Sequence, residues 1–548
     1  MASVPWVNEW NANAAVPFHR HDFGLPQVTI DSNIGPAELA QQGLQGQHSA
    51  RKVIKNSLAN VVTGLSIALT TILVPPVLAR TLTPLKFGAW SLVLQFAGYV
   101  KVLDLGMQGA VGRYVAYYLA RSDQQSAREF ASTAISLLTL VAAMGLTAIL
   151  VAALHLHLLF PQMPLELVKS TSLAMGLVGV TASIGLPASV FRGILVGIER
   201  NELVTLIVAP MGLVLCGALI FVGIVSRSIV DLAFTYSGIT LLSYGLYWRI
   251  SNRYAHLQVT PSHFRRSIAR ETVSYCSTTM IWSAAMLLIS GFDVAIVGRV
   301  DFRHVAVYAA CVAPITILAG AQNAMFGPML QVGARNFAHG STLKLRDLLE
   351  RATRISMLVN LAYVVPLFIL SHQILTLWLG GRYAKQGTLI LRLLLVGHAI
   401  RLVATPYANL LLATGQHHRA RIAPIVESAA NVTAAVLLGI RYGAVGVAAG
   451  VIIGAVVAQL LNYLYNFPRT QELIGDRNKL VWEAIVVPLA CFSPLALLCL
   501  PEQLAKNTEV SVVLDVLVTM LVLTLIWKVA LGPADRRLLL RTKSMRAD

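Results

Sequence analysis

The feature that most constrains this chain is a series of apolar blocks, each about 20 residues long. A helix needs about 20 apolar residues to cross roughly 30 Å of hydrocarbon, so each block has the length of a membrane span. Of the 548 residues, 56% are hydrophobic and only 12% are charged. A soluble protein could not hide so much apolar surface from water. The sequence therefore predicts an all-α integral membrane protein with many spans.

About fourteen candidate spans can be placed on the hydrophobic runs. They cover residues 56–79, 89–110, 129–154, 167–190, 203–224, 229–249, 272–297, 305–328, 355–378, 388–413, 422–440, 443–466, 481–500 and 509–531. The longest connections, near 250–271 and 331–354, have the size of amphipathic linkers. They leave no room for a folded catalytic domain, and the sequence has no GxxxxGK[ST] phosphate loop for ATP.

The basic residues predict the orientation of the spans. A net charge of +18 would suggest nucleic acid in a soluble protein. Here most Lys and Arg residues fall in alternate connections, as the positive-inside rule describes. Both termini are therefore expected in the cytoplasm, with no nucleic-acid partner. The five cysteines lie in apolar blocks without a CxxC pair, so neither a disulfide framework nor a metal site is expected.

Two halves of the chain share landmarks at a constant offset. Trp90 and Tyr308 are 218 positions apart, and so are Gly197 and Gly415, while Pro187 matches a proline at nearly the same offset. Six spans separate the copies, so the halves are predicted to be parallel repeats, and transporters built this way bind substrate between their halves. The predicted divisions are a poorly ordered cytoplasmic tail (1–50), an N-terminal six-helix bundle (51–250), a cytoplasmic linker (251–271), a C-terminal six-helix bundle (272–467), and two extra helices with a basic tail (468–548).

Three motifs resemble a known family. They are "LARTLTPLKFGAWSLVLQFAGYVKVLDLGMQGAVGRYVAYYLA" (78–120), "FRGILVGIERN" (191–201) and "LLATGQHHRAR" (411–421). The chain resembles, over roughly residues 50–470, the polysaccharide (O-antigen type) flippases of the multidrug/oligosaccharidyl-lipid/polysaccharide exporter superfamily. The "FG.W…LDLG…RY" pattern is fairly specific to the sugar-lipid branch of that superfamily.

The resemblance implies two six-helix bundles arranged in a V around a central, often cationic cavity. It implies alternating access, with an isoprenoid-diphosphate-linked oligosaccharide moved from the cytoplasmic to the outer face of a bacterial inner membrane. Such a lipid-linked sugar would be a precursor of lipopolysaccharide or exopolysaccharide. No cofactor is expected, although transport could be coupled to a proton or sodium gradient. The bilayer and the glycan polymerase machinery are the other expected partners.

Polar residues in the first two spans are candidates for lining that cavity. Asn56, Asn60 and Thr63 share one face of the first span, where they either line the cavity or bond to a neighbouring helix. Lys101, Asp104 and Gln108 follow at i, i+3 and i+7 in the second span. Lys101 should lie about 18 Å below the outer end of that span.

A charge at mid-membrane depth costs about 2.5–3.5 kcal/mol on insertion scales, so Lys101 should face water or a partner. It either meets the substrate or forms a structural ion pair with Asp104. Arg113, near the inner end of the same span, is a second candidate for the cavity or else a topology anchor.

A similar stripe of polar residues occurs in the span 388–413. It contains His398, Arg401 and Thr405. Arg401 should lie about 20 Å below the outer end, which matches the depth of Lys101 in the other half. Two cations at one depth would suit a diphosphate between them. His398 is either a buried structural histidine or a group that couples transport to protons.

Carboxylates provide the remaining candidates. Asp104 and Glu427 are the candidates for proton-linked groups, and Glu427 shares a helix face with Asn431. Asp293 and Arg299, near the outer end of the span 272–297, are expected to be solvated at the interface or to form an outer gate.

Three other functions fit the sequence less well than a flippase. A drug/cation antiporter of the same superfamily would favour an acidic pocket in the first span, where this sequence has asparagines instead. A membrane glycan polymerase or ligase needs a large outer loop, which the sequence lacks. A purely structural scaffold would not require Lys, Asp and Arg inside spans.

Overall fold

The computed structural model describes residues 68–104, 106–260, 263–270, 272–273, 287–289, 291–420, 422–494 and 520–530, together with Gly64 and Ser66. All regular structure in these residues is helical. The longer helices are Ala68–Thr81, α3 (Pro84–Val102), α4 (Met107–Ala120), α5 (Gln124–Leu154), α7 (Leu165–Gly197), α8 (Asn201–Val225), α9 (Ile229–Ala255), α12 (Val305–Phe326), α13 (Met329–Ala338), α14 (Thr342–Ile369), α16 (Gly381–Leu402) and α18 (Ile422–Leu461).

Short elements connect and extend these helices. They are α6 (Leu156–Leu159), α11 (Asp293–Val300), η2 (Phe302–His304), α15 (Ser371–Leu379), α17 (Thr405–Ala413), η3 (Gln416–Ala420), η4 (Asn462–Asn466), α19 (Phe467–Arg469), α20 (Gln471–Ile474), α21 (Arg477–Val481), η5 (Trp482–Val486), α22 (Val487–Phe492) and η7 (Ile526–Ala530).

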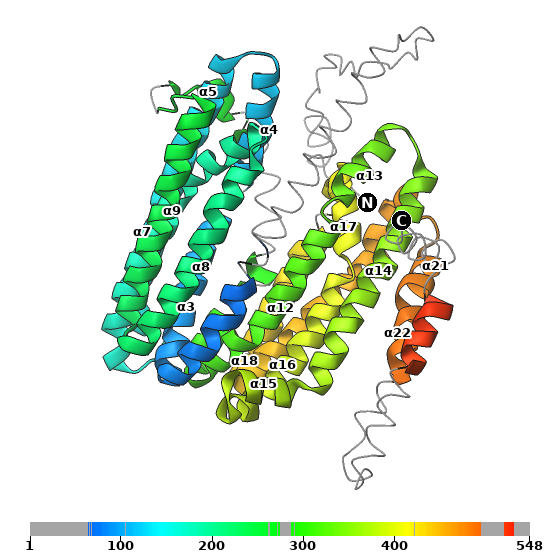
Figure 1. Cartoon of the computed structure of the whole chain (residues 1–548). Helices are drawn as coiled ribbons and strands as arrows, with labels where there is room; N and C mark the ends of the chain where they lie inside the picture. The colour runs from blue at the N-terminus through cyan, green and yellow to red at the C-terminus, as the bar shows by residue number, and fades with distance from the viewer. Residues whose placement is uncertain are drawn as a thin grey trace, which may run out of the picture. The chain divides into compact units, whose positions relative to one another are not determined.

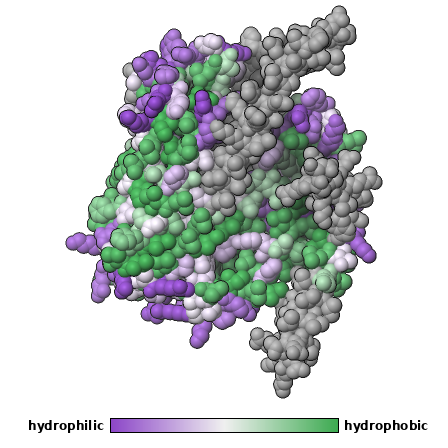
Figure 2. All heavy atoms as spheres, in the orientation of Figure 1, coloured by the Kyte–Doolittle hydropathy of each residue, from purple (hydrophilic) through white to green (hydrophobic). Residues whose placement is uncertain are grey.

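The predicted all-α membrane fold is confirmed. Eight helical segments in the described residues are long and apolar enough to cross a membrane. On the face that Figure 2 shows, apolar side chains cover the middle of the helices and polar side chains gather at their ends. The total of fourteen spans stays a prediction, because the spans 56–79, 272–297, 481–500 and 509–531 are only partly described.

Two predicted spans are not continuous helices. The span 89–110 is broken between α3 and α4, where Gly106 has a φ of 79°, a conformation that glycine adopts without strain. The span 388–413 is broken after Leu402. The next helix, α17, begins at Thr405, and Pro406 lies in its first turn, where a missing backbone N–H costs nothing. The expectation of one continuous helix over 89–110 was wrong, whereas the break near Pro406 agrees with the kink that a proline inside a span permits.

A sharp reversal separates the spans 422–440 and 443–466, as predicted. Gly443 lies between them with a φ of 60°. The Asp301 carboxylate accepts hydrogen bonds from the Ala444 backbone N–H at 3.1 Å and from His304 Nδ1 at 2.8 Å. Burial opposes ionisation of Asp301, but these two hydrogen bonds outweigh it and hold the pKa of the carboxyl below its usual range. The turn is thus fixed to the start of α12.

Within residues 59–548 the long helices form two groups (Figure 1). We call α3 to α9 the N-terminal half and α11 to α18 the C-terminal half, and α21 to α22 pack on α14 of the latter. The halves meet where α3 packs on α12. The two helices are close at this contact, because a Cβ added to Gly88 would lie only 3.2 Å from Val305 Cβ. Trp90 and Tyr308, the matched landmarks of the repeat, are both buried on these two helices. The predicted division boundaries stay predictions.

Glycines allow close packing inside both halves. In the N-terminal half, a Cβ on Gly193 or Gly197 would lie 2.8 Å from a backbone oxygen of α4, so part of the "FRGILVGIERN" motif is explained by small residues at a helix contact. In the C-terminal half, the two arms of α18 approach so closely that a Cβ on Gly450 would lie 2.5 Å from the Ala435 nitrogen. The atoms opposite Gly450 belong to the backbone of Ala435, which cannot move aside as a flexible side chain can, so only glycine fits at this position.

We expect Gly450→Ala to destabilise the protein by about 1–3 kcal/mol, the usual cost of overpacking. The matched control is Gly217→Ala in α8, where nothing lies within 4 Å of the new Cβ. Thermal unfolding in detergent should show a lower apparent melting temperature for Gly450→Ala alone. Equal melting temperatures for the two variants would contradict the close contact inside α18.

Candidate functional site

A hollow of about 470 Å³ lies inside the N-terminal half. Residues of α3, α4, α7, α8 and α9 line it, and Asp104 lines it from the turn between α3 and α4. Its charged and hydrogen-bonding side chains are Lys101, Asp104, Gln108, Ser189, Arg192, Tyr236, Thr240, Ser243, Tyr244 and Tyr247. Polar side chains thus line part of an open hollow in an otherwise apolar half.

Helical spacing explains how these side chains come to face the hollow. On α9, Tyr236, Thr240, Ser243 and Tyr247 recur at intervals of three and four residues, which places them on one face. On α7, Gly185, Ser189 and Arg192 do the same. The remaining wall comes from α8 and is apolar, with Val208, Met211 and Leu215.

Lys101 and Asp104 both line the hollow, but no ion pair joins them in the structure. Lys101 Nζ donates to the Tyr236 hydroxyl at 3.0 Å and lies over the same ring, 5.8 Å from its centroid. The Asp104 carboxylate accepts from Ser189 Oγ at 2.7 Å and from the Gln108 backbone N–H at 3.2 Å. The alternative of a Lys101–Asp104 structural pair is therefore wrong, because each group is held by a different neighbour.

The break between α3 and α4 has a direct effect on the site. Because α4 begins at Met107, the backbone N–H of Gln108 has no acceptor within a continuous helix. It donates instead to the Asp104 carboxylate. Gln108 still lines the hollow, as its place in the sequence stripe predicted. Arg113 is exposed on α4 and does not line this hollow. Asn56, Asn60 and Thr63 lie outside the described residues.

The cation of the C-terminal half is in a different environment. Arg401 Nε donates to Glu427 Oε1 at 2.7 Å, and the side chains of both residues are close to 90% buried. The other two guanidinium nitrogens of Arg401 are buried without a hydrogen-bond partner among the described residues. His398 is partly buried nearby on α16, and Thr405 is partly buried at the start of α17.

A second buried polar contact lies close to this ion pair. Asn431, fully buried on α18, donates to the Ile289 carbonyl at 3.1 Å and faces Asp293 Oδ1 at 3.5 Å. Asp293 is 4% exposed. The prediction of interfacial solvation for Asp293 is therefore wrong, because α11 turns this carboxylate into the C-terminal half. Arg299 instead donates to two carbonyls of α6, those of Leu158 and Leu159.

Lys101 and Arg401 therefore do not share one lining in this structure. Lys101 faces the hollow of the N-terminal half, whereas Arg401 does not line that hollow and is occupied by Glu427. Helix depth predicted from the sequence that both cations lie in spans. It does not predict their partners, which are Tyr236 for Lys101 and Glu427 for Arg401. Contact of either residue with substrate stays a prediction.

The sequence reasoning missed several residues of the hollow. Ser189, Arg192 and the tyrosines of α9 were not proposed, although the spacing of Tyr236, Thr240, Ser243 and Tyr247 is visible in the sequence. In the sequence, Arg192 is distinguished only by its place in the "FRGILVGIERN" motif. A search for a polar face in every span, rather than for charges, would have found the α9 face.

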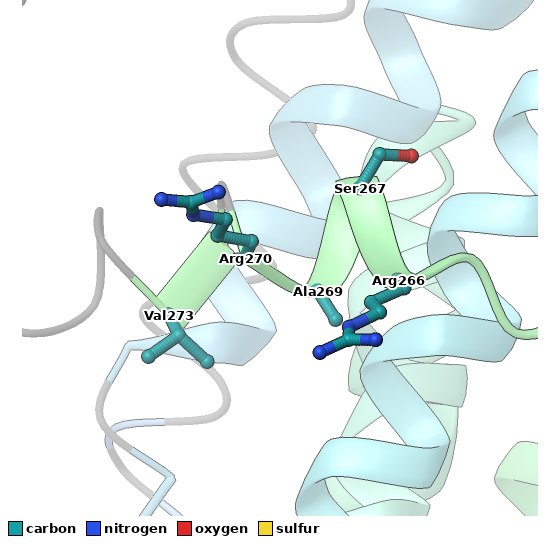
Figure 3. Close-up of a pocket in the computed structure, with 5 residues that line it drawn as sticks. All are labelled: Arg266, Ser267, Ala269, Arg270 and Val273. Carbon is teal, nitrogen blue, oxygen red and sulfur yellow. The ribbon is translucent and has the colours of Figure 1, made fainter.

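Another hollow, of about 630 Å³, lies along the segment that joins the halves. It is lined by Arg266, Ser267, Ala269, Arg270 and Val273. Figure 3 shows Arg266 and Arg270 pointing to opposite sides of this short segment. The two guanidinium groups thus do not converge on one ligand. Among the described residues, no group of three or more His, Cys, Asp or Glu side chains could hold a metal ion.

Comparison with solved structures gives the same fold. A lipid II flippase, MurJ, in an inward closed conformation is 13% identical and matches over 87% of this chain and 99% of that chain, with a TM-score of 0.64. An inward-facing multidrug resistance MATE family transporter of the MOP superfamily is 18% identical, covers 76% of this chain and 98% of its own, and has a TM-score of 0.61.

A MOP superfamily transporter from Pyrococcus furiosus is also similar. Its title describes a binding pocket of reverse polarity that suggests a different function. It is 17% identical, with a TM-score of 0.57 over 77% of this chain and 96% of that chain. Among curated proteins, none matches the sequence significantly.

Two family models match the sequence. The lipid II flippase MurJ model matches residues 314–518, and the model described as polysaccharide biosynthesis protein matches residues 53–330. With the solved structures above, these matches confirm the prediction of a membrane transporter rather than an enzyme. The second match spans about half of the sequence, and the chain therefore belongs to the polysaccharide biosynthesis protein family.

Proposed function

We propose that this protein is a flippase that moves an isoprenoid-diphosphate-linked oligosaccharide across the membrane by alternating access. The observation behind the proposal is the polar hollow of the N-terminal half, with Lys101 exposed at its wall. A sugar head group needs hydrogen-bonding partners, and a diphosphate needs positive charge, because hydrocarbon offers neither. The hollow supplies both inside a membrane-spanning helix group.

The family matches support the same substrate class. Both a polysaccharide biosynthesis model and a lipid II flippase model match this chain, so one description names polysaccharide biosynthesis and the other names a lipid flippase. We place the protein in a bacterial inner membrane with both termini in the cytoplasm, on the basis of its basic inner connections. Handover to glycan polymerase machinery and coupling to a proton or sodium gradient belong to the same proposal.

The contacts between the halves support alternating access. Gln95 Nε2 donates to the Gly291 carbonyl at 2.7 Å, and the same carbonyl accepts from the Tyr99 hydroxyl. Tyr99 also stacks on Phe292, with ring centroids 5.2 Å apart. Further hydrogen bonds join Gln162 to Val300 and Trp378 to Ile72.

By the predicted topology, all of these contacts lie in the outer half of the spans or in the outer connections between them. We infer that they form an outer barrier, closed in this conformation.

A drug/cation antiporter is the competing function, because MATE transporters share the fold. A pocket for an organic cation would need free carboxylates. Asp104 is the one carboxylate in the lining of the described hollow, and two hydrogen bonds already occupy it. Lys101 and Arg192 in the same lining favour an anionic ligand instead.

Replacement of Lys101 tests the proposed substrate. We expect Lys101→Ala to slow translocation of an isoprenoid-diphosphate oligosaccharide in proteoliposomes by about tenfold or more, because a charge-assisted contact is worth about 1.5–3 kcal/mol. Lys101→Arg should retain most of the rate. The control is Lys169→Ala, an exposed lysine on α7. Unchanged translocation by Lys101→Ala would refute the assignment of this hollow to the diphosphate.

The Arg401–Glu427 pair is our candidate for proton coupling, because protonation of Glu427 would break it. Removal of one partner alone leaves a buried charge unpaired and costs about 3–5 kcal/mol. Arg401→Leu should therefore lower the apparent melting temperature strongly, and the Arg401→Leu/Glu427→Leu double variant should recover most of the loss. The double variant should also lose the dependence of transport on a proton gradient. A double variant as unstable as the single one would show that the two charges do not stabilise each other.

Loosening of the outer barrier should be visible directly. Gln95→Ala combined with Tyr99→Phe removes both donors to the Gly291 carbonyl, each worth about 0.5–1.5 kcal/mol. Spin labels on Leu165 and Leu377, both 83% exposed, report the separation of the halves at this end. Electron–electron distance measurements should gain a longer component in the double variant. An unchanged distance distribution would mean that these bonds do not hold the barrier closed.

A further inference from the structure

The buried apolar side chains at the inner end of the C-terminal half form a hydrophobic cluster separate from the main core, which the two halves share. We call this end the inner cap. It comprises α13, residues 342–353 of α14, α17, η3 and α19 to α21. Figure 1 shows α13 and α17 at this end of the half and α15 at the opposite end. The buried residues of the cluster are Met329, Leu345, Leu349, Ala352, Tyr407, Leu410, Leu411, Ala420, Leu473, Ile474 and Leu480, with Phe326 and Ala484 at its edge.

A layer of buried polar side chains lies between the inner cap and the main core. Gln322 Nε2 on α12 donates to Asn360 Oδ1 at 2.7 Å, and Ser356 Oγ donates to Gln322 Oε1 at 3.0 Å. All three side chains are fully buried. On α14 they divide Leu349, in the cap cluster, from Val364, in the main core, and a third small cluster at this level faces α22. The apolar packing of the half is therefore divided at the layer.

The end of α16 lies in the same layer and is bound to other helices by hydrogen bonds. The Ile400 carbonyl accepts from Gln459 Nε2 at 2.7 Å, and the Leu402 carbonyl accepts from Ser356 Oγ at 3.3 Å. Arg401, between these two residues, forms the ion pair with α18. The last carbonyls of a helix have no partner within it, so side chains of α14 and α18 take that place.

Most helices that reach the layer are interrupted there. Helix α12 ends at Phe326, ahead of Pro328, which lacks the N–H needed to continue it, and α16 ends at Leu402. Helix α18 and the helix after α21 each contain a π-helical turn, η4 and η5, and such turns are frequent at functional sites. Helix α14, in contrast, passes through the layer without a break. It is the continuous connection between the cap and the rest of the half.

The N-terminal half has no polar layer at the matching positions of α5. Leu138 and Ala142 lie 218 positions before Ser356 and Asn360, and both are buried in the main core. The other buried apolar residues of α5 belong to the main core along the whole helix. One repeat is therefore packed continuously from end to end, whereas the other is divided.

The "LLATGQHHRAR" motif holds the inner cap together as one body. Gln416 Nε2 and Arg419 Nη1 donate to Glu472 Oε1 at 2.9 and 2.7 Å. Arg346 donates to the backbone carbonyls of Glu472 and Gln471 at 3.2 and 3.3 Å. These bonds join η3, α14 and α20, so the elements of the cap can move together.

We propose that the inner cap turns about α14 relative to the rest of the C-terminal half, and that this turn closes the inner end when the outer barrier opens. The inference rests on the proposed alternating access and goes beyond it, because rocking of two rigid halves needs no division inside one of them. During the turn Ser356 and Asn360 exchange hydrogen-bond partners across the layer. Asn360 Nδ2 is buried and has no such partner in the part of the chain that the structure describes. Exchange of hydrogen bonds disturbs the structure less than separation of an interdigitated apolar core.

The test measures distances within each half of the full-length protein in proteoliposomes. One pair of spin labels is placed on Phe337 of α13 and Leu377 of α15, both exposed, so that the pair spans the layer. The matched control pair is on Tyr117 of α4 and Leu158 of α6, also exposed, in the undivided half. We expect two resolved distances for the first pair and one for the control. The Gln95→Ala/Tyr99→Phe variant, with a loosened outer barrier, should shift the first pair toward its second distance.

The triple variant Gln322→Leu/Ser356→Leu/Asn360→Ala gives α14 the residues of α5 at the layer. It should lose the second distance and slow translocation by about tenfold or more, because the conformational step is impeded. If this variant does not fold, the distances in the unaltered protein still decide.

A single, unchanged distance between the labels on Phe337 and Leu377 in a protein that translocates the sugar lipid overturns the inference and leaves the proposed function standing. Equal spreading of both pairs also overturns it, because each half would then flex as a whole. Two distances in a protein that translocates no sugar lipid support the cap and refute the proposed substrate.

Discussion

A charged side chain inside a membrane must find water, a ligand or an opposite charge, and this constraint organises both halves of the protein. In the C-terminal half the constraint is met internally, because Arg401 and Glu427 neutralise each other in a buried pair. In the N-terminal half it is met around a hollow, where Lys101 donates to the Tyr236 hydroxyl and the Arg192 Nε has no hydrogen-bond partner in the part of the chain that the structure describes. The two halves are predicted to be repeats of one another, but they use their cations differently.

This asymmetry gives each half a distinct task in the proposed mechanism. The N-terminal half presents positive charge and hydroxyl groups to the head group, while the C-terminal half holds a titratable ion pair. The contacts through Gln95, Tyr99 and Gly291 connect them in the predicted outer half of the membrane. Movement of one half against the other would separate these contacts. The same movement would shift α3 against α12, which pack closely at Gly88.

The sequence predicted the class of fold well because apolar block length and loop charge follow directly from the membrane. It located Lys101, Asp104 and Gln108, which do line one hollow. It failed where local backbone chemistry or tertiary partners decide the outcome. Gly106 breaks the helix that was expected to be continuous, Asp293 is buried rather than solvated, and Arg401 is neutralised by a residue of another helix. Partner identity across helices is not encoded in the spacing of a single span.

The most direct test of the account is an experimental structure of the full-length protein with bound farnesyl diphosphate. The account predicts that the two phosphorus atoms lie in the N-terminal hollow, with their oxygens within hydrogen-bond distance of Lys101 and Arg192. A diphosphate bound beside Arg401, or on the outer surface away from this hollow, would contradict it.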